Sequence, residues 1–488
     1  MTDATDFEEA PEELATEPAP APKGRSAVVV GARVLTGAVG VGVAALAIAG
    51  ATWLPLPTVG GDVRALDVHP TAAAQERVCA GSLLRFGDES GQDARAVAPI
   101  GEPDIRFAAT DGMPRLQPMA GGAGGPHRVT LEPTGPEQST FGASQSQAGG
   151  EFAGFAAAQC AMPASQTWLV GGASTTGRVT LIRLVNPSTV DSLVDLTIHT
   201  ENGIITAAGT DGIVVPPGGE RVLPLAGFAP DAASPVIRVV SRGGEIVATL
   251  QQSIVRTLAP SGVDLIGGVN APSTGIVIPG FVINGGHAAE ELTAGATVDD
   301  AGAVIRLLAP GNEDATAMLS MTPEDGSPAV DPVAIDLTAG QVIDVALDHI
   351  EDGSYTVRVD ATLPVVAAAR STTADGEGGT DFAWFGAAPV LSEPALLSVA
   401  PGPWAALHLV NPTEQDAEVT VTSETGSEET VSVPAGAAAV VPVPAGGTFE
   451  LDGFDQLHVS VSYRGATELA GFVVTGPSPL ARDIRVLL

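Results

Sequence analysis

A short residue pattern recurs three times in the chain, and it restricts the fold more than any other feature of the sequence. Each copy is an apolar run with one polar side chain near its middle and a proline at its end, and proline cannot donate a hydrogen bond to a neighbouring strand. The copies are Leu181-Ile182-Arg183-Leu184-Val185-Asn186-Pro187, Val304-Ile305-Arg306-Leu307-Leu308-Ala309-Pro310 and Ala406-Leu407-His408-Leu409-Val410-Asn411-Pro412. The sequence therefore predicts three copies of one structural unit.

Each copy continues with residues that alternate between apolar and polar. Val194, Leu196 and Ile198 alternate with polar neighbours, and Val419 and Val421 do so in the third copy. A period of two is typical of a half-buried strand. The 59 glycines and 39 prolines, set against only 4% aromatic residues, fit many short strands joined by turns. We predict an all-β fold with about three tandem antiparallel, immunoglobulin-like β-sandwiches arranged as a rod.

The repeats also set the expected domain boundaries, with sandwiches at 166–274, 275–385 and 386–488. Before them, residues 55–165 are rich in glycine, serine and glutamine between positions 85 and 150. We expect 55–165 to be a loop-rich extracytoplasmic segment that packs on the first sandwich.

The N-terminal part predicts a membrane anchor. Residues 34–54 carry no charge, and 21 helical residues span about 31 Å, close to the thickness of a bilayer core. Lys23, Arg25 and Arg33 precede this segment, so the positive-inside rule places residues 1–33, an acidic and disordered tail, in the cytoplasm. We expect a single-pass plasma-membrane protein, the transmembrane helix followed by an extracytoplasmic bulk.

A cleaved signal peptide is the alternative. Ala47-Ile48-Ala49 resembles a cleavage site, although the apolar run continues beyond it. Both alternatives place the residues that follow outside the cytoplasm.

The chain has two cysteines, Cys79 and Cys160, and both follow the apolar segment. An even pair in an oxidising compartment is most simply a disulfide, and neither residue lies in a C-x-x-C motif or near a histidine. We predict a structural disulfide between them.

Charge excludes one class of partner. The formal net charge is -35, with 22 basic against 57 acidic residues. Such a surface repels nucleic acid, so we expect no nucleic-acid partner.

Motifs of catalysis are absent from the sequence. It contains no H-E-x-x-H, G-x-S-x-G, P-loop or strand-associated G-x-G-x-x-G pattern. We predict no catalytic residue, no metal site and no cofactor, while a Ser-His-Asp triad built from distant residues stays open because geometry defines it. His199 and His458 fall on the polar faces of strands, and His408 takes the place of Arg183 and Arg306, so all are expected at the solvated surface.

Two further residue sets allow ligand binding. Trp168, Trp384 and Trp404 are candidate stacking platforms for a sugar, or alternatively plugs of the core and of domain contacts. The acidic turns at 324–326 and 351–353 could ligate Ca²⁺, although acidic residues beside glycine are mostly solvated turns.

The order of these parts resembles a family of actinobacterial membrane-anchored proteins known as domain of unknown function 5719. The resemblance rests on Ala158-Gln159-Cys160, Thr167-Trp168-Leu169-Val170-Gly171-Gly172, Leu184-Val185-Asn186-Pro187 and Asp381-Phe382-Ala383-Trp384. It implies location and topology, and it supplies no catalytic residues.

These observations predict a non-enzymatic, single-pass cell-envelope protein whose β-sandwich array is a structural or interaction module. Its partners would be the cell membrane, through 34–54, and another envelope protein or a glycan. Two alternatives stay open: an accessory or glycan-binding subunit for an envelope glycosyltransferase, and a hydrolase with an unrecognised site.

Overall fold

The structure is a computed structural model. It describes residues 39, 41–43, 65–68, 73–87, 96–120, 124–135, 139–269, 271–292, 301–476 and 484–487. The predicted tail and most of the predicted membrane segment 34–54 lie outside these ranges. Among the residues that are described, no helix is both long enough and apolar enough to cross a membrane.

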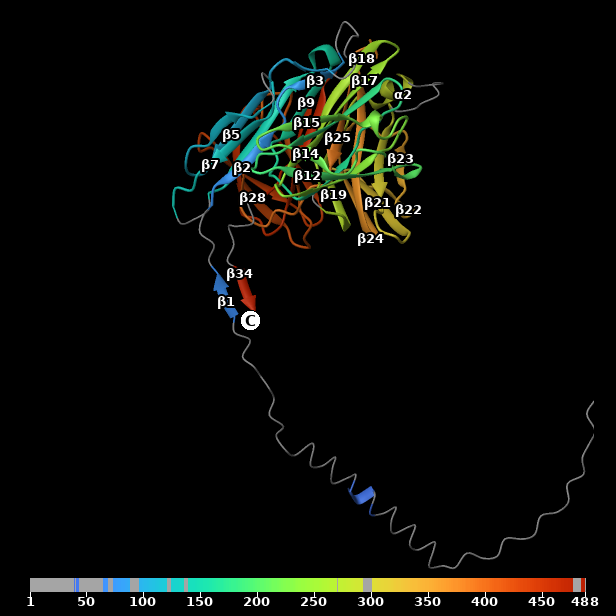
Figure 1. Cartoon of the computed structure of the whole chain (residues 1–488). Coiled ribbons are helices and arrows are strands. Elements are labelled where there is room, and N and C mark those ends of the chain that lie inside the picture. The colour runs from blue at the N-terminus through green and yellow to red at the C-terminus, as the bar shows by residue number, and fades with distance from the viewer. Residues whose placement is uncertain are drawn as a thin grey trace, which may run out of the picture. The chain divides into compact units, whose positions relative to one another are not determined.

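The chain divides into two compact units. The first comprises Met1–Val68 with Arg485–Leu488, and the second comprises His69–Ile484. Strand β1 (Ala65–Val68) forms a two-stranded sheet with β34 (Ile484–Leu487). All the structure discussed below belongs to the second unit (Figure 1).

The first repeat folds into two antiparallel sheets packed face to face. One has the order β10-β16-β12-β13, with β14 also on β12, and the other has the order β15-β11-β17-β18. Val194 and Ile198 of β12 in the first of these sheets share one buried core with Ile182 and Leu184 of β11 in the second. The strands are β10 (Gln166–Val170), β11 (Arg178–Val185), β12 (Ser192–Thr200), β13 (Gly203–Ile205), β14 (Ile213–Val215), β15 (Glu220–Pro224), β16 (Val236–Arg242), β17 (Val247–Arg256) and β18 (Ala259–Ile266), with a 3-10 turn η2 (Leu225–Gly227).

The second repeat is a similar layered unit in which one long strand serves both sheets. The first part of β24 pairs with β19 and β21, and its last part pairs with β20 and β25. The elements are β19 (Ser273–Ile283), α2 (Gly286–Leu292), β20 (Ala303–Leu308), β21 (Ala315–Pro323), β22 (Val330–Leu337), β23 (Val342–Leu347), β24 (Gly353–Ala374) and β25 (Thr380–Gly386).

The third repeat has two four-stranded sheets, ordered β26-β31-β28-β29 and β30-β27-β32-β33. Leu407 and Leu409 of the central strand β27 lie in its core with Val459 and Val461. The strands are β26 (Ala395–Ser398), β27 (Ala406–Val410), β28 (Ala417–Ser423), β29 (Glu428–Val433), β30 (Ala438–Pro442), β31 (Thr448–Asp452), β32 (His458–Arg464) and β33 (Leu469–Val473). The all-β prediction is confirmed, and we call these units the first, second and third sandwich.

Residues 75–159 hold more regular structure than their composition indicated. Those of them that the structure describes form eight strands and a 3-10 turn, which we call the N-terminal module. Its sheets have the orders β2-β7-β6, β3-β4 and β5-β8-β9. The elements are β2 (Gln75–Cys79), β3 (Leu83–Phe86), β4 (Val97–Ile100), β5 (Asp104–Ala109), β6 (Arg115–Pro118), β7 (His127–Leu131), β8 (Phe141–Ala148), η1 (Gly150–Phe152) and β9 (Phe155–Gln159).

The asparagine at the strand end of the first and third copies has the same structural role in both. Asn186 Nδ2 donates to the carbonyls of Val190 and Val215 at 2.7 and 2.8 Å, and so joins the end of β11 to the opposite sheet. Asn411 makes the same pair of bonds, to Gln415 and Val433, at 2.7 and 3.0 Å. In both copies a buried amide with both donors satisfied holds in place the segment that crosses from one sheet to the other.

The predicted disulfide is confirmed. Cys79 at the end of β2 is bonded to Cys160 just after β9, and both are fully buried. The bond closes a loop with a sequence separation of 81, which in the chain-entropy model stabilises the fold by about 4.5 kcal/mol.

The expected rod of separate sandwiches is wrong. Asp381 of the second sandwich accepts backbone hydrogen bonds from Phe155 of the N-terminal module, Val263 of the first sandwich and Leu469 of the third. One side chain therefore touches all three other modules. The last strand of each module, β9, β18, β25 and β33, meets the others at this common centre.

Candidate functional site

The polar position of the repeat is buried in all three copies. Arg183, Arg306 and His408 each have 0% exposed side chains, so the surface position expected for them is wrong. The alternation places each on the face of its strand opposite the core, as expected. That face does not meet water, because a preceding module covers it.

Arg306 shows the full pattern. Its guanidinium pairs bidentately with Asp344, with both N···O distances at 2.8 Å. The remaining donors reach carbonyls of the first sandwich, Gly172 at 2.9 Å, Ala233 at 3.0 Å and Pro235 at 3.1 Å. All five N–H groups are therefore satisfied, and the charge docks the second sandwich on the first. The pKa of the Asp344 carboxyl is lowered by Arg306 despite burial.

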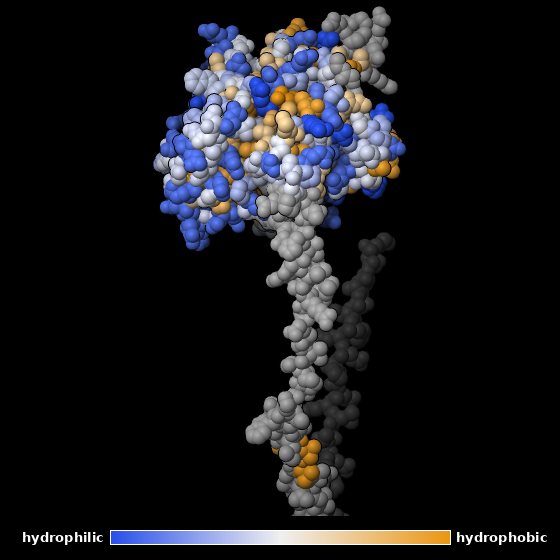
Figure 2. Space-filling view, turned by 90° about the vertical axis from the view of Figure 1, so that its left-hand side faces the viewer, coloured by the Kyte–Doolittle hydropathy of each residue, from blue (hydrophilic) through white to orange (hydrophobic). Residues whose placement is uncertain are grey.

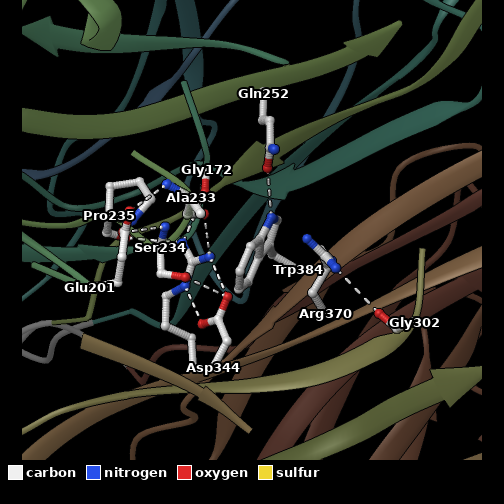
Figure 3. Close-up of polar contacts among 11 residues, drawn as sticks. Gly172, Glu201, Ala233, Ser234, Pro235, Gln252, Gly302, Asp344, Arg370 and Trp384 are labelled. Atoms are coloured by element: carbon white, nitrogen blue, oxygen red, sulfur yellow. Dashed lines mark hydrogen bonds and ion pairs between the residues drawn. The ribbon is translucent and has the colours of Figure 1, made fainter. Parts of the chain in front are cut away.

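Trp384 lies near Asp344 and Arg370 (Figure 3) and packs against the guanidinium of Arg306. Its ring is 4.6 Å from the Arg306 guanidinium carbon and 5.7 Å from that of Arg370. Its indole nitrogen donates to Gln252 Oε1 of the first sandwich at 2.8 Å. With 3% of its surface exposed, Trp384 is a contact between sandwiches, held by two cation–π interactions.

Arg183 docks the first sandwich on the N-terminal module in the same manner. Its Nε pairs with Glu220 at 2.8 Å, Nη1 donates to the carbonyl of Ser82 at 2.9 Å, and Nη2 donates to that of Ala80. Two further bonds join Gln251 with the backbone of Leu84.

His408 docks the third sandwich on the second. Its Nδ1 lies 2.5 Å from Glu324 Oε2, and its Nε2 lies 2.7 Å from Ser462 Oγ. The other oxygen of Glu324 accepts from the Gly280 backbone at 2.9 Å and from Thr356 at 2.8 Å. These charge-assisted bonds lower the pKa of Glu324 although burial opposes them.

Ser462, His408 and Glu324 are connected in the order of a hydrolase triad. Two observations favour a docking role for them. Ser462 is in the middle of β32, paired with Ala406 and Gly471, and so lacks the exposed turn on which such nucleophiles lie. The register of the other copies places Gln251 and Arg370 at the position of Ser462, and Gln251 also bonds the backbone of another module, at Leu84.

Arg77 of the N-terminal module completes the set of docking contacts. It donates to the carbonyl of Phe141 at 3.2 Å, to Thr475 Oγ1 at 3.2 Å and to the carbonyl of Gly476 at 3.5 Å. The last two acceptors follow β33, so Arg77 links the N-terminal module with the third sandwich. Each module is thereby docked on two others, and the contacts form a closed circuit.

Two buried carboxyl groups occupy the centre. Asp264 accepts from the backbone N–H groups of Trp384 at 2.7 Å and Leu265 at 2.8 Å, and burial raises its pKa to about 7. Burial likewise raises the pKa of Asp381 well above its usual value. Both groups hold strands of different modules together.

Two other histidines depart from their expected solvated positions. His199 is buried, and its Nδ1 lies 3.0 Å from the carbonyl of Gly340 in the second sandwich. His458 is buried, with Nδ1 2.8 Å from the carbonyl of Ala388. Burial lowers the pKa of both imidazoles. Each is a further contact at a module boundary.

Of the three tryptophans predicted to face a ligand, only Trp404 is exposed. Trp168 is 4% exposed and packs in the first core, whereas Trp404 is 84% exposed. Trp404 has a φ of 39°, which is unfavourable for a residue with a side chain. It borders a groove of about 500 Å³, together with Ser462 and Arg464.

A larger cavity of about 740 Å³ lies where the four modules meet. Residues of every module line it, among them Arg77, Val170, Trp384 and Phe472. Its walls are predominantly apolar, as is usual for ligand sites.

No cluster of metal-ligating side chains occurs in the part of the chain that the structure describes. The two acidic turns considered for Ca²⁺ have other contacts. Glu324 is buried beside His408, and Asp352 accepts from the backbone N–H groups of Gly285 and Gly286.

Several residues of the centre were not singled out from the sequence. The carboxylates Glu220, Asp344 and Asp264 lie outside the repeated pattern, and nothing in their local sequence marks them. Arg77 could have been found from the sequence. The stretch Arg77-Val78-Cys79-Ala80-Gly81 loosely matches the second half of the repeated pattern, which begins with the polar residue. Comparing the N-terminal part with the three copies would have found it.

The profile of one protein family, described as "Family of unknown function (DUF5719)", matches residues 119–444. No curated protein matches the chain. Among solved structures, an anti-sigma factor domain-containing protein from Clostridium clariflavum has a TM-score of 0.12 at 8% identity, covering 85% of this chain and 97% of that one. A biofilm associated protein (BSP domain) has a TM-score of 0.11 at 8% identity, with the same coverage. Neither likeness carries an argument.

Proposed function

This chain belongs to DUF5719, a family of unknown function, and from that premise we propose that it is an actinobacterial single-pass envelope protein acting as a non-enzymatic structural or interaction module. One observation carries the proposal. The buried polar side chains of Arg183, Arg306 and His408 each pair with a carboxylate and bind another module. These contacts join the modules into one rigid body, and a rigid body presents fixed surfaces to a partner.

The surface supports an interaction role. Hydrophilic residues predominate on the face seen in Figure 2, and hydrophobic residues gather in one area near its middle. Exposed apolar groups that gather in this way are a feature of interaction surfaces.

Location is tested with a cysteine at the exposed position 404. We expect an impermeant maleimide to label Trp404→Cys in intact spheroplasts of the native host, since Cys79 and Cys160 are buried in their disulfide. Thr16→Cys, in the predicted cytoplasmic tail, should react only after lysis. Labelling of position 404 only after lysis would place the body inside the cell and overturn the proposal, and a mature N-terminus near Gly50 would indicate a cleaved signal peptide.

The proposal that the protein is not an enzyme is tested at Ser462. A fluorophosphonate probe reacts with serines activated by a histidine, and we expect no adduct on Ser462 because the hydroxyl is almost fully buried in a docking contact. Chymotrypsin serves as the positive control, and Ser460, two residues away on the same strand, is the internal comparison. An adduct on Ser462 that Ser462→Ala abolishes and Ser460→Ala retains would make the protein a hydrolase.

Glycan binding is a second candidate function, and Trp404 is the observation that favours it. The positive φ of Trp404 lowers the stability of the fold, and its indole ring is exposed to water. Both features are understandable if the ring stacks on a sugar. Affinity electrophoresis in dextran and in alginate should show retardation that Trp404→Ala removes. The control is Leu258→Ala, because Leu258 is 95% exposed and also has a positive φ. Equal mobility with and without both polysaccharides would exclude this function for Trp404.

A further inference from the structure

Among the residues that the structure describes, no carboxylate pairs with Arg77, in contrast to the two other docking arginines. Arg183 and Arg306 each contact an acid at 2.8 Å, Glu220 and Asp344. Arg77 is as deeply buried, yet the hydrogen bonds that it makes reach only neutral acceptors, at 3.2–3.5 Å. Burial without a neighbouring anion lowers its pKa to about 10, so it still carries its charge at neutral pH. A buried cation of this kind is costly unless an anion compensates for it.

The cavity of about 740 Å³ gives such an anion room beside Arg77. Apolar groups from three modules form much of its wall, including Phe141, Ile266 and Phe472. Gln159 and Thr475 add polar groups near Arg77, and they hydrogen-bond each other at 2.9 Å. Glu76 and Glu245 also line the cavity, which favours a singly charged carboxylate over a phosphate monoester with nearly two charges.

We propose that this cavity binds an organic anion with one acidic head group and an apolar body. The head group pairs with the two guanidinium N–H groups of Arg77 that make no bond within the described part of the chain, and the planar fork matches a carboxylate or a phosphate monoester. The body lies against Phe141, Ile266 and Phe472 and is removed from water. The site is built by residues of one compact unit and does not depend on the proposed envelope function.

Calorimetry on the purified full chain tests the proposal, with the same solution without protein as the blank. The probes are octanoate, octyl phosphate and octanol, which share one apolar body and differ in the head group. We expect saturable binding of at least one anion and at least about tenfold weaker binding of octanol, because a hydrogen bond to a charged group contributes about 1.5–3 kcal/mol. The preferred anion identifies the head group.

Two variants locate the binding. Arg77→Gln should weaken anion binding about tenfold or more and leave octanol binding unchanged. Arg128→Gln is the matched control, since Arg128 lies opposite β2 on β7, near Glu76, but is not part of the cavity wall. Should Arg77→Gln fail to fold, Val473→Trp, which fills the cavity while keeping Arg77, should abolish binding of the anion.

Three results would overturn the proposal. They are the absence of saturable binding by both anions, octanol affinity equal to that of the anions, and wild-type anion affinity in either folded variant.

Discussion

Arg306→Ala should destabilise the protein by about 3–5 kcal/mol, the range found when one member of a buried ion pair is removed. The substitution leaves Asp344, whose side chain is only 24% exposed, without its cation, and it leaves the carbonyls of Gly172, Ala233 and Pro235 without their donor. Denaturant unfolding of the purified full chain measures the loss. Because Trp384 lies 4.6 Å from Arg306, its fluorescence should shift to longer wavelength as water enters the contact.

The matched control for this variant is Arg242→Ala. Arg242 also pairs with an acid, Asp195, at 2.6 Å, but its side chain is 66% exposed. An exposed pair contributes at most about 1 kcal/mol, so this variant should unfold close to the wild type. Equal losses in the two variants would show that the Arg306 contact does not hold the first two sandwiches together.

Asp264→Asn should change how stability depends on pH. The pKa of Asp264 is about 7 in the folded protein, against about 3.9 for an unfolded chain. Between these values the folded state binds a proton that the unfolded state has lost, so the contribution of Asp264 is complete below about pH 4 and is lost as pH rises through 7. Asparagine is neutral throughout, so the variant should gain about 3–4 kcal/mol relative to the wild type between pH 4 and pH 8.

At low pH the same variant should be less stable than the wild type. Asp264 is protonated there, but its hydroxyl oxygen can still accept a hydrogen bond, whereas the NH2 group of asparagine cannot, so one of the two backbone N–H groups, of Leu265 or Trp384, loses its acceptor. The loss of one such bond costs about 1–3 kcal/mol. Urea unfolding from pH 4 to pH 8 measures both effects, with the exposed Asp348→Asn as control. Parallel pH curves for Asp264→Asn and the wild type would contradict the prediction.

The sequence predicted the strands of the repeat well because their signal is local. Alternation along Val194–Ile198 and the proline after Asn186 specify a strand and its end without reference to the rest of the chain. The disulfide was predictable for a similar reason, since only Cys79 and Cys160 were available to form it.

The docking contacts were not predictable, although the sequence marked their positions. The pattern identified Arg183, Arg306 and His408 as equivalent residues on the outer faces of strands. Alternation tells which face of a sheet a residue occupies, but it contains no information on whether another module covers that face. The partners Asp344 and Glu324 are 38 and 84 residues from Arg306 and His408, so no local pattern connects them.

The closed circuit of contacts has a consequence for the order in which the protein is completed. Arg77 is synthesised 398 residues before Thr475, the side chain that it bonds in the third sandwich. At synthesis rates of about 5–20 residues per second, this cation waits about 20–80 seconds for its acceptors. During that time Cys79 and Cys160 can form their disulfide, but the N-terminal module still lacks its contacts with the third sandwich. The first module to emerge from the ribosome is therefore the last to be finished, and a chain truncated before Thr475 leaves its earliest-made part unclosed.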